Sequence, residues 1–189
     1  MNFSDIYNSF NIKPEASVEY TMKLFKKSIN AYLNYYFMNY KKPSFFVSGV
    51  VTTPSGASTP LVGNLATLST FQISTIREND ILNNLSKFGF INGFFKTMTD
   101  IINKSLFFVD IKFSGFLFPQ NVKLNLTPSP MSEIFEKELN TKKPDNYQIF
   151  WQFMDQKINE FFKLSTPITI PYSSPGIATV FNGTISVKL

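Results

Sequence analysis

Histidine and cysteine are both absent from this chain of 189 residues. Without these residues a Ser-His-Asp or Cys-His nucleophile cannot form, and the usual nitrogen and sulfur ligands of zinc are missing. The composition therefore excludes most hydrolases that depend on such a nucleophile. Acid-base chemistry would have to use carboxylates.

The one acidic cluster consists of Glu133, Glu136 and Glu138. A two-carboxylate glycosidase needs only such residues, so a carboxylate enzyme is one alternative if these side chains share a pocket. However, they fall in the N-terminal half of a short predicted helix over 129–140, where acidic residues favour the helix dipole. We interpret them as a solvated helix face, and we expect no catalytic, cofactor-binding or metal site.

Binding of phosphates or nucleic acids has little support in the sequence. The eight glycines are scattered and form no phosphate-binding loop. The net charge is +5, but Arg77 is the only arginine, and arginine is the preferred residue for bidentate contacts with phosphate and guanine. The alternative function is a nucleic-acid-associated accessory protein that uses its lysines. The lysines that this alternative would use are Lys23, Lys26, Lys27, Lys41 and Lys42.

The stretch 75–126 is the best candidate for the core, because it joins a helical pattern to a Phe-rich hairpin. Thr75 and Glu78 match a capping box, which predicts a helix beginning near Ile76. Gly89 and Gly93 interrupt this helix and predict either a break or close packing against a neighbour. The apolar face has a helical spacing and comprises Ile81, Leu85, Phe88, Phe95, Met98, Ile102 and Leu106.

The rest of the chain shows the same alternation of helices and strands. Residues 107–117 alternate with period two, break at 119–121 and resume over 122–126, which predicts a hairpin. A long amphipathic helix is expected over 14–40, with Phe25 and Tyr40 on its apolar stripe. A second one is expected after Asp145, with Trp151, Met154 and Ile158 on its stripe, and it should pack on the sheet. Two strands separated by a loop at 54–60 follow the first helix, with an irregularity at 63–64.

The C-terminal region predicts two more strands, over 166–172 and 177–189. Prolines at positions 167 and 171 cannot donate to a central ladder, so the first strand belongs at an edge. Residues 173–176 are expected to turn the chain. The pair Asn182-Gly183 is expected to bend the last strand.

Together these elements predict an α+β fold. It comprises three helix-plus-β-hairpin units, with a mostly antiparallel sheet packed against long amphipathic helices. An N-terminal arm over 1–12 would precede a single domain over 13–189.

Several segments are candidates for contacts with other subunits. The chain has 22 phenylalanines and only 16% charged residues, and large apolar patches on proteins commonly mark interfaces. We expect contacts through the arm and through two polar loops. The expected interface residues are Phe3, Ile6, Tyr7, Phe10, Pro54, Ser55, Gly56, Pro60, Ser173, Ser174, Pro175 and Gly176.

The whole chain resembles small structural proteins of double-stranded DNA bacteriophage particles, of the tail-completion, neck or baseplate type. The resemblance rests on helices followed by hairpins, few charges, abundant Phe, a terminal arm and a Ser/Thr/Pro/Gly loop. It implies a non-enzymatic subunit of the virion, present in the host cytoplasm during assembly. Its partners would be other copies of itself, in a ring, and other virion proteins. We expect no small-molecule substrate. We also expect no membrane span, because no window contains 18 uninterrupted apolar residues.

Overall fold

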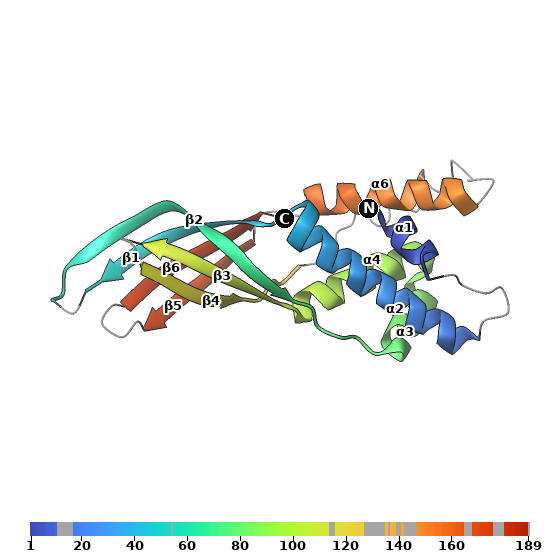
Figure 1. Ribbon diagram of the computed structural model, residues 1–189, viewed down its shortest axis with the longest axis horizontal. Coiled ribbons are helices and arrows are strands. Elements are labelled where there is room, and N and C mark those ends of the chain that lie inside the picture. Colours follow the sequence, from blue (N-terminus) through green and yellow to red (C-terminus); the bar gives the residue numbers. More distant parts are fainter. Residues whose placement is uncertain are drawn as a thin grey trace.

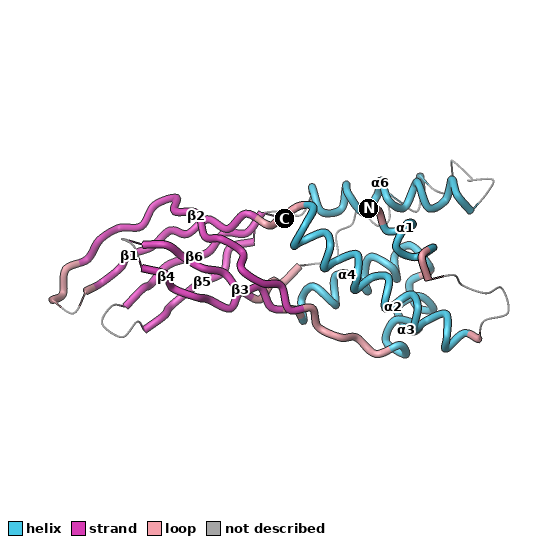
Figure 2. Tube along the Cα trace, in the orientation of Figure 1, coloured by secondary structure: helices cyan, strands magenta, loops and turns pink. Residues whose placement is uncertain are grey.

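The computed structural model combines helices with an antiparallel sheet, which confirms the predicted α+β class. Figure 1 shows that the strands gather in one half of an elongated molecule and the helices in the other. The same division by secondary structure is visible in Figure 2. We call these parts the sheet half and the helical half. The structure describes residues 1–10, 17–53, 55–113, 116–126, 135, 137–138, 141, 147–164, 168–175 and 180–188.

The sheet has six strands in the order β4-β3-β2-β1-β6-β5, and every neighbouring pair is antiparallel. Consecutive strands form the hairpins β1–β2, β3–β4 and β5–β6. The strands are β1 (Ser44–Thr52), β2 (Ser58–Gln72), β3 (Leu106–Phe113), β4 (Phe116–Val122), β5 (Ile168–Pro175) and β6 (Val180–Lys188).

The predicted alternation is confirmed along β3. Phe107, Val109 and Ile111 of β3 are buried, whereas Lys112 is exposed. The β3–β4 hairpin also forms, but the predicted break at 119–121 is wrong, because Pro119 lies within β4 opposite Asp110. Proline is tolerated there because β4 is an edge strand and one side of it needs no ladder donors.

The other edge of the sheet is β5, as its prolines predict. However, β5 continues through Pro175, so the predicted turn beginning at Ser173 is wrong. Between β1 and β2 the register shifts opposite Gly63, where an irregularity was expected. β6 pairs with β1 in unbroken register through Asn182 and Gly183, so the expected bend does not interrupt the ladder.

The helical half contains α1 from the start of the chain, α2, α3 and α4 from its first 104 residues, and α6, which precedes the last hairpin (Figure 1). A five-residue π-helical turn, η1, extends α2. The elements are α1 (Phe3–Asn8), α2 (Val18–Tyr35), η1 (Tyr36–Tyr40), α3 (Glu78–Phe88), α4 (Phe90–Lys104) and α6 (Tyr147–Leu164). Most of the predicted helix 129–140 lies outside the described residues.

The predicted capping box at Thr75 is wrong. Helix α3 begins at Glu78 with Arg77 at its N-cap, and no side chain caps it. Glu78 accepts a hydrogen bond from Lys26 Nζ of α2 at 3.2 Å, and hydrogen bonds from its own backbone amide and from Lys26 lower the Glu78 pKa. The contact with α2 therefore replaces the expected cap.

Both outcomes expected for the central glycines occur. Gly89 adopts a φ of 77° and separates α3 from α4. A Cβ atom at Gly93 would lie 2.6 Å from the carbonyl oxygen of Asn84, so the two helices touch through their backbones. The break also explains why Phe88, which was expected on the apolar face, is 40% exposed. Phe88 is the last residue of α3, and the apolar face of α3 does not continue into α4.

Helix α2 departs from its prediction at both ends. It begins at Val18, where the Ser17 hydroxyl accepts a hydrogen bond from the Tyr20 amide at 3.2 Å. The proposed start at Pro14 lies outside the described residues. At the other end, Lys41 N donates to Tyr36 O at 2.7 Å and closes the π-helical turn. The wider turn rotates Tyr40 off the apolar stripe, so it is 54% exposed.

Helix α6 buries the predicted stripe, including Trp151, Met154 and Ile158. The prediction that α6 packs on the sheet is wrong, because its aromatic rings contact other helices. Trp151 lies 5.2 Å from Phe3 of α1 between ring centroids, and Phe161 lies 5.1 Å from Phe95 of α4. Thus α6 covers the helical half.

The two halves meet at Phe37 of η1. Its ring lies 5.0 Å from Phe71 of β2 and 5.3 Å from Phe107 of β3. On the helical side it lies 5.5 Å from Phe162 of α6. A single buried side chain therefore contacts both parts of the core.

Candidate functional site

The N-terminal segment packs on its own chain. Phe3 and Ile6 are buried in the core, which corrects the expectation that they contact a neighbour. Tyr7 and Phe10 are partly buried against the same core. Figure 1 places α1 beside α6, within the helical half.

A carboxylate on α6 holds α1 in place. Asp155 Oδ1 accepts hydrogen bonds from the amides of Phe3 at 2.9 Å and Ser4 at 3.3 Å, and Oδ2 accepts from Ser4 Oγ at 2.7 Å. Burial raises the pKa of Asp155, although these hydrogen bonds favour the ionised form. Both amides belong to the first turn of α1, where an acceptor and a negative charge are stabilising. These first residues are therefore anchored and are not a free arm.

The loop between β1 and β2 forms an exposed tip, as predicted. The Thr53 amide donates to Ala57 O at 2.9 Å, and the Gly56 amide donates to Thr53 O at 2.9 Å. Gly56 has a φ of +80° and open space where a Cβ atom would lie. Ser55, Gly56 and Pro60 are all exposed, whereas Pro54 lies outside the described residues. We refer to residues 55–60 as the hairpin tip.

The sheet brings two of the predicted contact segments to the same end. Pro60 pairs with Val50, Val50 pairs with Asn182, and Asn182 pairs with Ser173. The row formed by Ser58, Thr52, Val180 and Pro175 lies two residues further toward the tip. The tip and the described part of 173–176 thus share one end of the sheet, and α1 lies in the other half (Figure 1). Gly176 lies outside the described residues.

The acidic cluster is described only at Glu138. This residue forms an ion pair with Lys157 Nζ at 2.7 Å, and Glu160 contacts the same nitrogen at 2.7 Å. The Lys157 side chain is only 4% exposed and lies over the ring of Phe135 at 5.0 Å. Desolvation acts to lower the Lys157 pKa, but the hydrogen bonds to both glutamates outweigh it and raise the pKa. Glu138 thus has a structural role, and Glu133 and Glu136 lie outside the described residues.

The lysines proposed for nucleic-acid binding are partly neutralised. Lys23 forms an ion pair with Glu19 at 2.8 Å, and Lys26 forms one with Glu78 at 3.2 Å. Contacts of this kind reduce the positive potential that a phosphate backbone would meet. The described geometry does not strengthen the nucleic-acid alternative.

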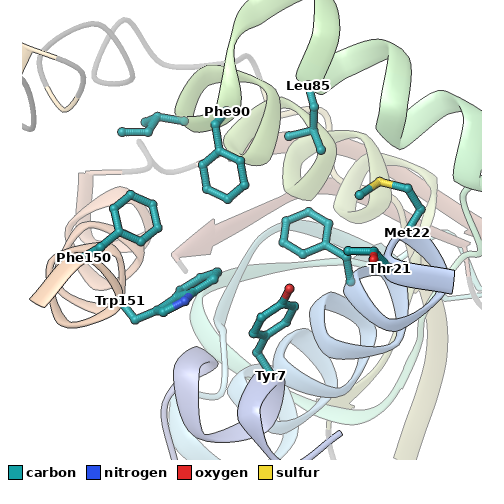
Figure 3. Close-up of a pocket in the computed structure, with 9 residues that line it drawn as sticks. Tyr7, Thr21, Met22, Leu85, Phe90, Phe150 and Trp151 are labelled. Carbon is teal, nitrogen blue, oxygen red and sulfur yellow. The ribbon is translucent and has the colours of Figure 1, made fainter. Parts of the chain in front are cut away.

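The helical half contains an apolar cavity of about 440 Å³. Figure 3 shows its walls, which come from α1, α2, α6 and the α3–α4 junction, with side chains of all these elements converging on one space. None of the lining side chains is charged. The lining residues are Tyr7, Thr21, Met22, Phe25, Leu85, Phe90, Ile91, Phe150 and Trp151.

The chain matches no protein-family model, and comparisons with curated proteins and with solved structures found no match. Function must therefore be argued from the molecule itself. Among the described helices, none combines the length and the apolar character needed to cross a bilayer.

Sequence reasoning did not identify the cavity. It assigned Tyr7 to an intersubunit contact and placed Phe25 and Trp151 on buried helix stripes. Thr21, Phe90 and Ile91 were assigned no role, because a periodic pattern identifies a helix face but does not show where several faces fail to meet. The close spacing of Gly89 and Gly93 in the sequence was the only signal that the chain changes direction beside this cavity.

Proposed function

We propose that this protein is a non-enzymatic structural subunit of a bacteriophage particle, in the tail, neck or baseplate. The observation that carries this proposal is the hairpin tip, which is exposed at the end of the longest of the described strands. β2 has 15 residues, and a strand of that length spans about 50 Å. A long hairpin of this kind suits a subunit that reaches over a neighbour.

The chemistry of the tip favours contacts through hydrogen bonds and shape. Residues 52–60 contain no charged side chain and include five hydroxyl groups. Within the tip, Thr53 Oγ1 and Ser55 Oγ are 2.8 Å apart, and Thr52 Oγ1 and Ser58 Oγ are 3.3 Å apart. Association through such a surface depends little on ionic strength, in contrast to binding of nucleic acid.

The sheet edges support the same proposal. Among the described strands, β4 and β5 each have one side without a strand neighbour. Strand addition to an edge is a common way to join subunits. Pro119 in β4 and Pro171 in β5 cannot donate hydrogen bonds. A partner strand would therefore pair with only a short part of either edge.

The test is the mass of the full chain, measured by light scattering after size exclusion at two concentrations and in low and high salt. The expected result is a closed ring that persists in high salt and is visible in negative-stain images. Ala57→Glu, which places a charge on the tip, should shift the mass toward the monomer. Ala31→Glu is the matched control, because Ala31 is also exposed but lies on α2.

Two results would contradict the proposal. One is a monomer under every condition, including after mixing with lysate proteins of an infected host. The other is a ring that Ala57→Glu and Ala31→Glu leave equally intact, because the tip would then make no contact. Retention on DNA that is lost steeply with salt would instead favour the nucleic-acid alternative.

A further inference from the structure

The apolar cavity of the helical half is a second candidate site, independent of the hairpin tip. Its volume of about 440 Å³ lies within the range of about 300–1,000 Å³ that holds small ligands. The cavity is open to solvent, because Phe90 is 42% exposed and Tyr7, Thr21 and Met22 are only partly buried. An apolar hollow that faces solvent is a common feature of ligand-binding sites.

The walls define the chemistry of the ligand. Rings of Phe25, Phe150 and Trp151 surround Phe90, with centroid distances of 6.2, 5.7 and 6.5 Å. These rings are inclined to one another, at interplanar angles between 46° and 78°. Another ring or a short alkyl chain would therefore find both ring faces and ring edges to pack against.

Polar groups at the cavity are few. Figure 3 shows the hydroxyl of Tyr7 directed toward the space between the helices. Thr21 Oγ1 already donates to Ser17 O at 3.1 Å. A charged ligand would lose its hydration without gaining an opposite charge, which is costly in an apolar site.

The hairpin tip of a second copy does not fit this cavity. Between Ser55 and Thr59 the largest apolar side chain is that of Ala57. Such a segment would bring hydroxyl groups and backbone amides into an apolar space with few partners for them. The geometry and the chemistry instead favour a separate, compact molecule.

We propose that this cavity binds an uncharged small molecule with an aromatic or aliphatic body and at most one hydrogen-bonding group. The ligand is held by burial of its apolar surface among the aromatic rings. This role goes beyond a structural function and does not depend on it.

Trp151 provides a direct measurement, because it lines the cavity and is the only tryptophan of the chain. The full-length protein is titrated with N-phenyl-1-naphthylamine, an uncharged aromatic probe that accepts energy from tryptophan. The expected result is saturable quenching of Trp151 with one probe per chain. A melting temperature that rises with probe concentration should accompany it.

Two neighbouring phenylalanines form a matched pair of variants. Phe88 and Phe90 lie on either side of Gly89 and are 40% and 42% exposed, but only Phe90 lines the cavity. Phe90→Ala should weaken probe binding by about tenfold. Phe88→Ala should leave the affinity unchanged, which shows that a general loss of surface aromatic area is not the cause.

A second variant fills the cavity without removing a ring. Thr21→Phe should abolish probe binding, whereas Ala31→Phe on the exposed face of the same helix should not. A cooperative thermal transition for each variant checks that it is folded. If Thr21→Phe does not fold, the comparison of Phe90→Ala with Phe88→Ala still decides the question.

Three results would overturn the proposal. The first is the absence of saturable quenching by the probe, and the second is equal affinity in all four variants. The third is a change of Trp151 emission with protein concentration in the absence of probe, together with a dimer that the probe dissociates. In that case the cavity is filled by a second copy.

Discussion

In the sheet half, buried and less buried side chains alternate along β1 and along β3 from residue 106 to 112, whereas in the helical half the buried face changes direction at Gly89 and again at η1. The strands of the sheet hold one another through ladders that are unbroken in β1–β6, β3–β4 and β5–β6 and that shift register once in β1–β2 and once in β2–β3. The helices are held by individual contacts that lie far apart in sequence, such as Asp155 with Phe3 and Lys26 with Glu78. The comparison shows that periodicity defines a sheet more completely than a helix bundle.

The first prediction tests whether the two halves form one cooperative unit. Phe37→Ala removes the ring that contacts Phe71, Phe107 and Phe162. It should lower the free energy of unfolding by about 4 kcal/mol, because it leaves a large cavity in the core. Denaturant unfolding followed by Trp151 emission, which reports the helical half, should then separate from unfolding followed by circular dichroism.

The control for this variant is Phe46→Ala, because Phe46 lies on the exposed face of β1. It should change the stability far less and keep the two unfolding curves superimposed. Superimposed curves for Phe37→Ala would show that other contacts couple the halves.

The second prediction concerns close packing within the helical half. Gly93→Ala places a Cβ atom 2.6 Å from both Asn84 O and the Cα atom of Leu85. The backbones of α3 and α4 would have to separate, at a cost of about 3 kcal/mol. Chemical denaturation measures this loss.

A glycine in the sheet half provides the contrast. Gly56→Ala meets no atom within 4 Å, and its cost comes only from a φ of +80°. That cost should be about 1 kcal/mol. Equal costs at both positions would contradict the steric explanation for Gly93.

The glycines of the helical half also show which features of the fold can be predicted from the sequence. Gly89 and Gly93 by themselves indicate a break and a close approach, because glycine in a helix interior is otherwise unfavourable. The start of α3 could not be predicted in the same way. Thr75 and Glu78 have the spacing of a capping box, but the Glu78 side chain instead contacts Lys26 of another helix. The alternation along β3 was predicted correctly, because it needs no knowledge of distant residues, whereas the limits of β4 and β5, which depend on their pairing partners, were not.

The candidate sites also differ in whether the sequence predicts them. Exposure of the hairpin tip followed from its local Ser, Thr, Pro and Gly content. The cavity did not follow from the sequence, because it depends on how five helices fail to fill a common space. The anchor of α1 was also missed, since nothing near Asp155 in sequence indicates that it binds the amides of Phe3 and Ser4.

The third prediction tests that anchor. Asp155→Ala leaves the Phe3 and Ser4 amides without their acceptor and should cost about 2 kcal/mol. Asp155→Asn retains one oxygen that can accept from both amides, so its cost should be smaller. Faster hydrogen exchange at these two amides is expected in the alanine variant. Unchanged exchange would show that the hydrogen bonds to Asp155 do not hold the start of α1 in place.

The fourth prediction concerns alkaline pH and again separates the halves. Burial raises the pKa of Tyr32 and of Tyr36 in the helical half, from an ordinary value of 10.0. Above that pH the unfolded chain releases these phenolic protons while the folded chain keeps them. The unfolded state then binds fewer protons, so stability falls as pH rises, by up to about 1.4 kcal/mol per pH unit for each tyrosine.

Lys157 contributes in the same direction, because its raised pKa also keeps a proton on the folded chain after the unfolded chain has lost it. Unfolding free energies at several pH values between neutral and strongly alkaline measure the slope. The double variant Tyr32→Phe/Tyr36→Phe should show a shallower decline above pH 10 and the same slope as the parent below pH 9. An identical slope above pH 10 would contradict the prediction.

The π-helical turn η1 limits how the chain length can change. Its closing hydrogen bond spans five residues, from Tyr36 O to Lys41 N, so this turn holds one residue more than an α-helical turn. Deleting one residue here would either rotate α2 within its aromatic core or slide β1 by one position, which would turn its buried side chains outward. Because β1 is paired on both sides, neither adjustment is available at low cost. Natural insertions and deletions should therefore be absent from residues 36–43 and tolerated at the hairpin tip.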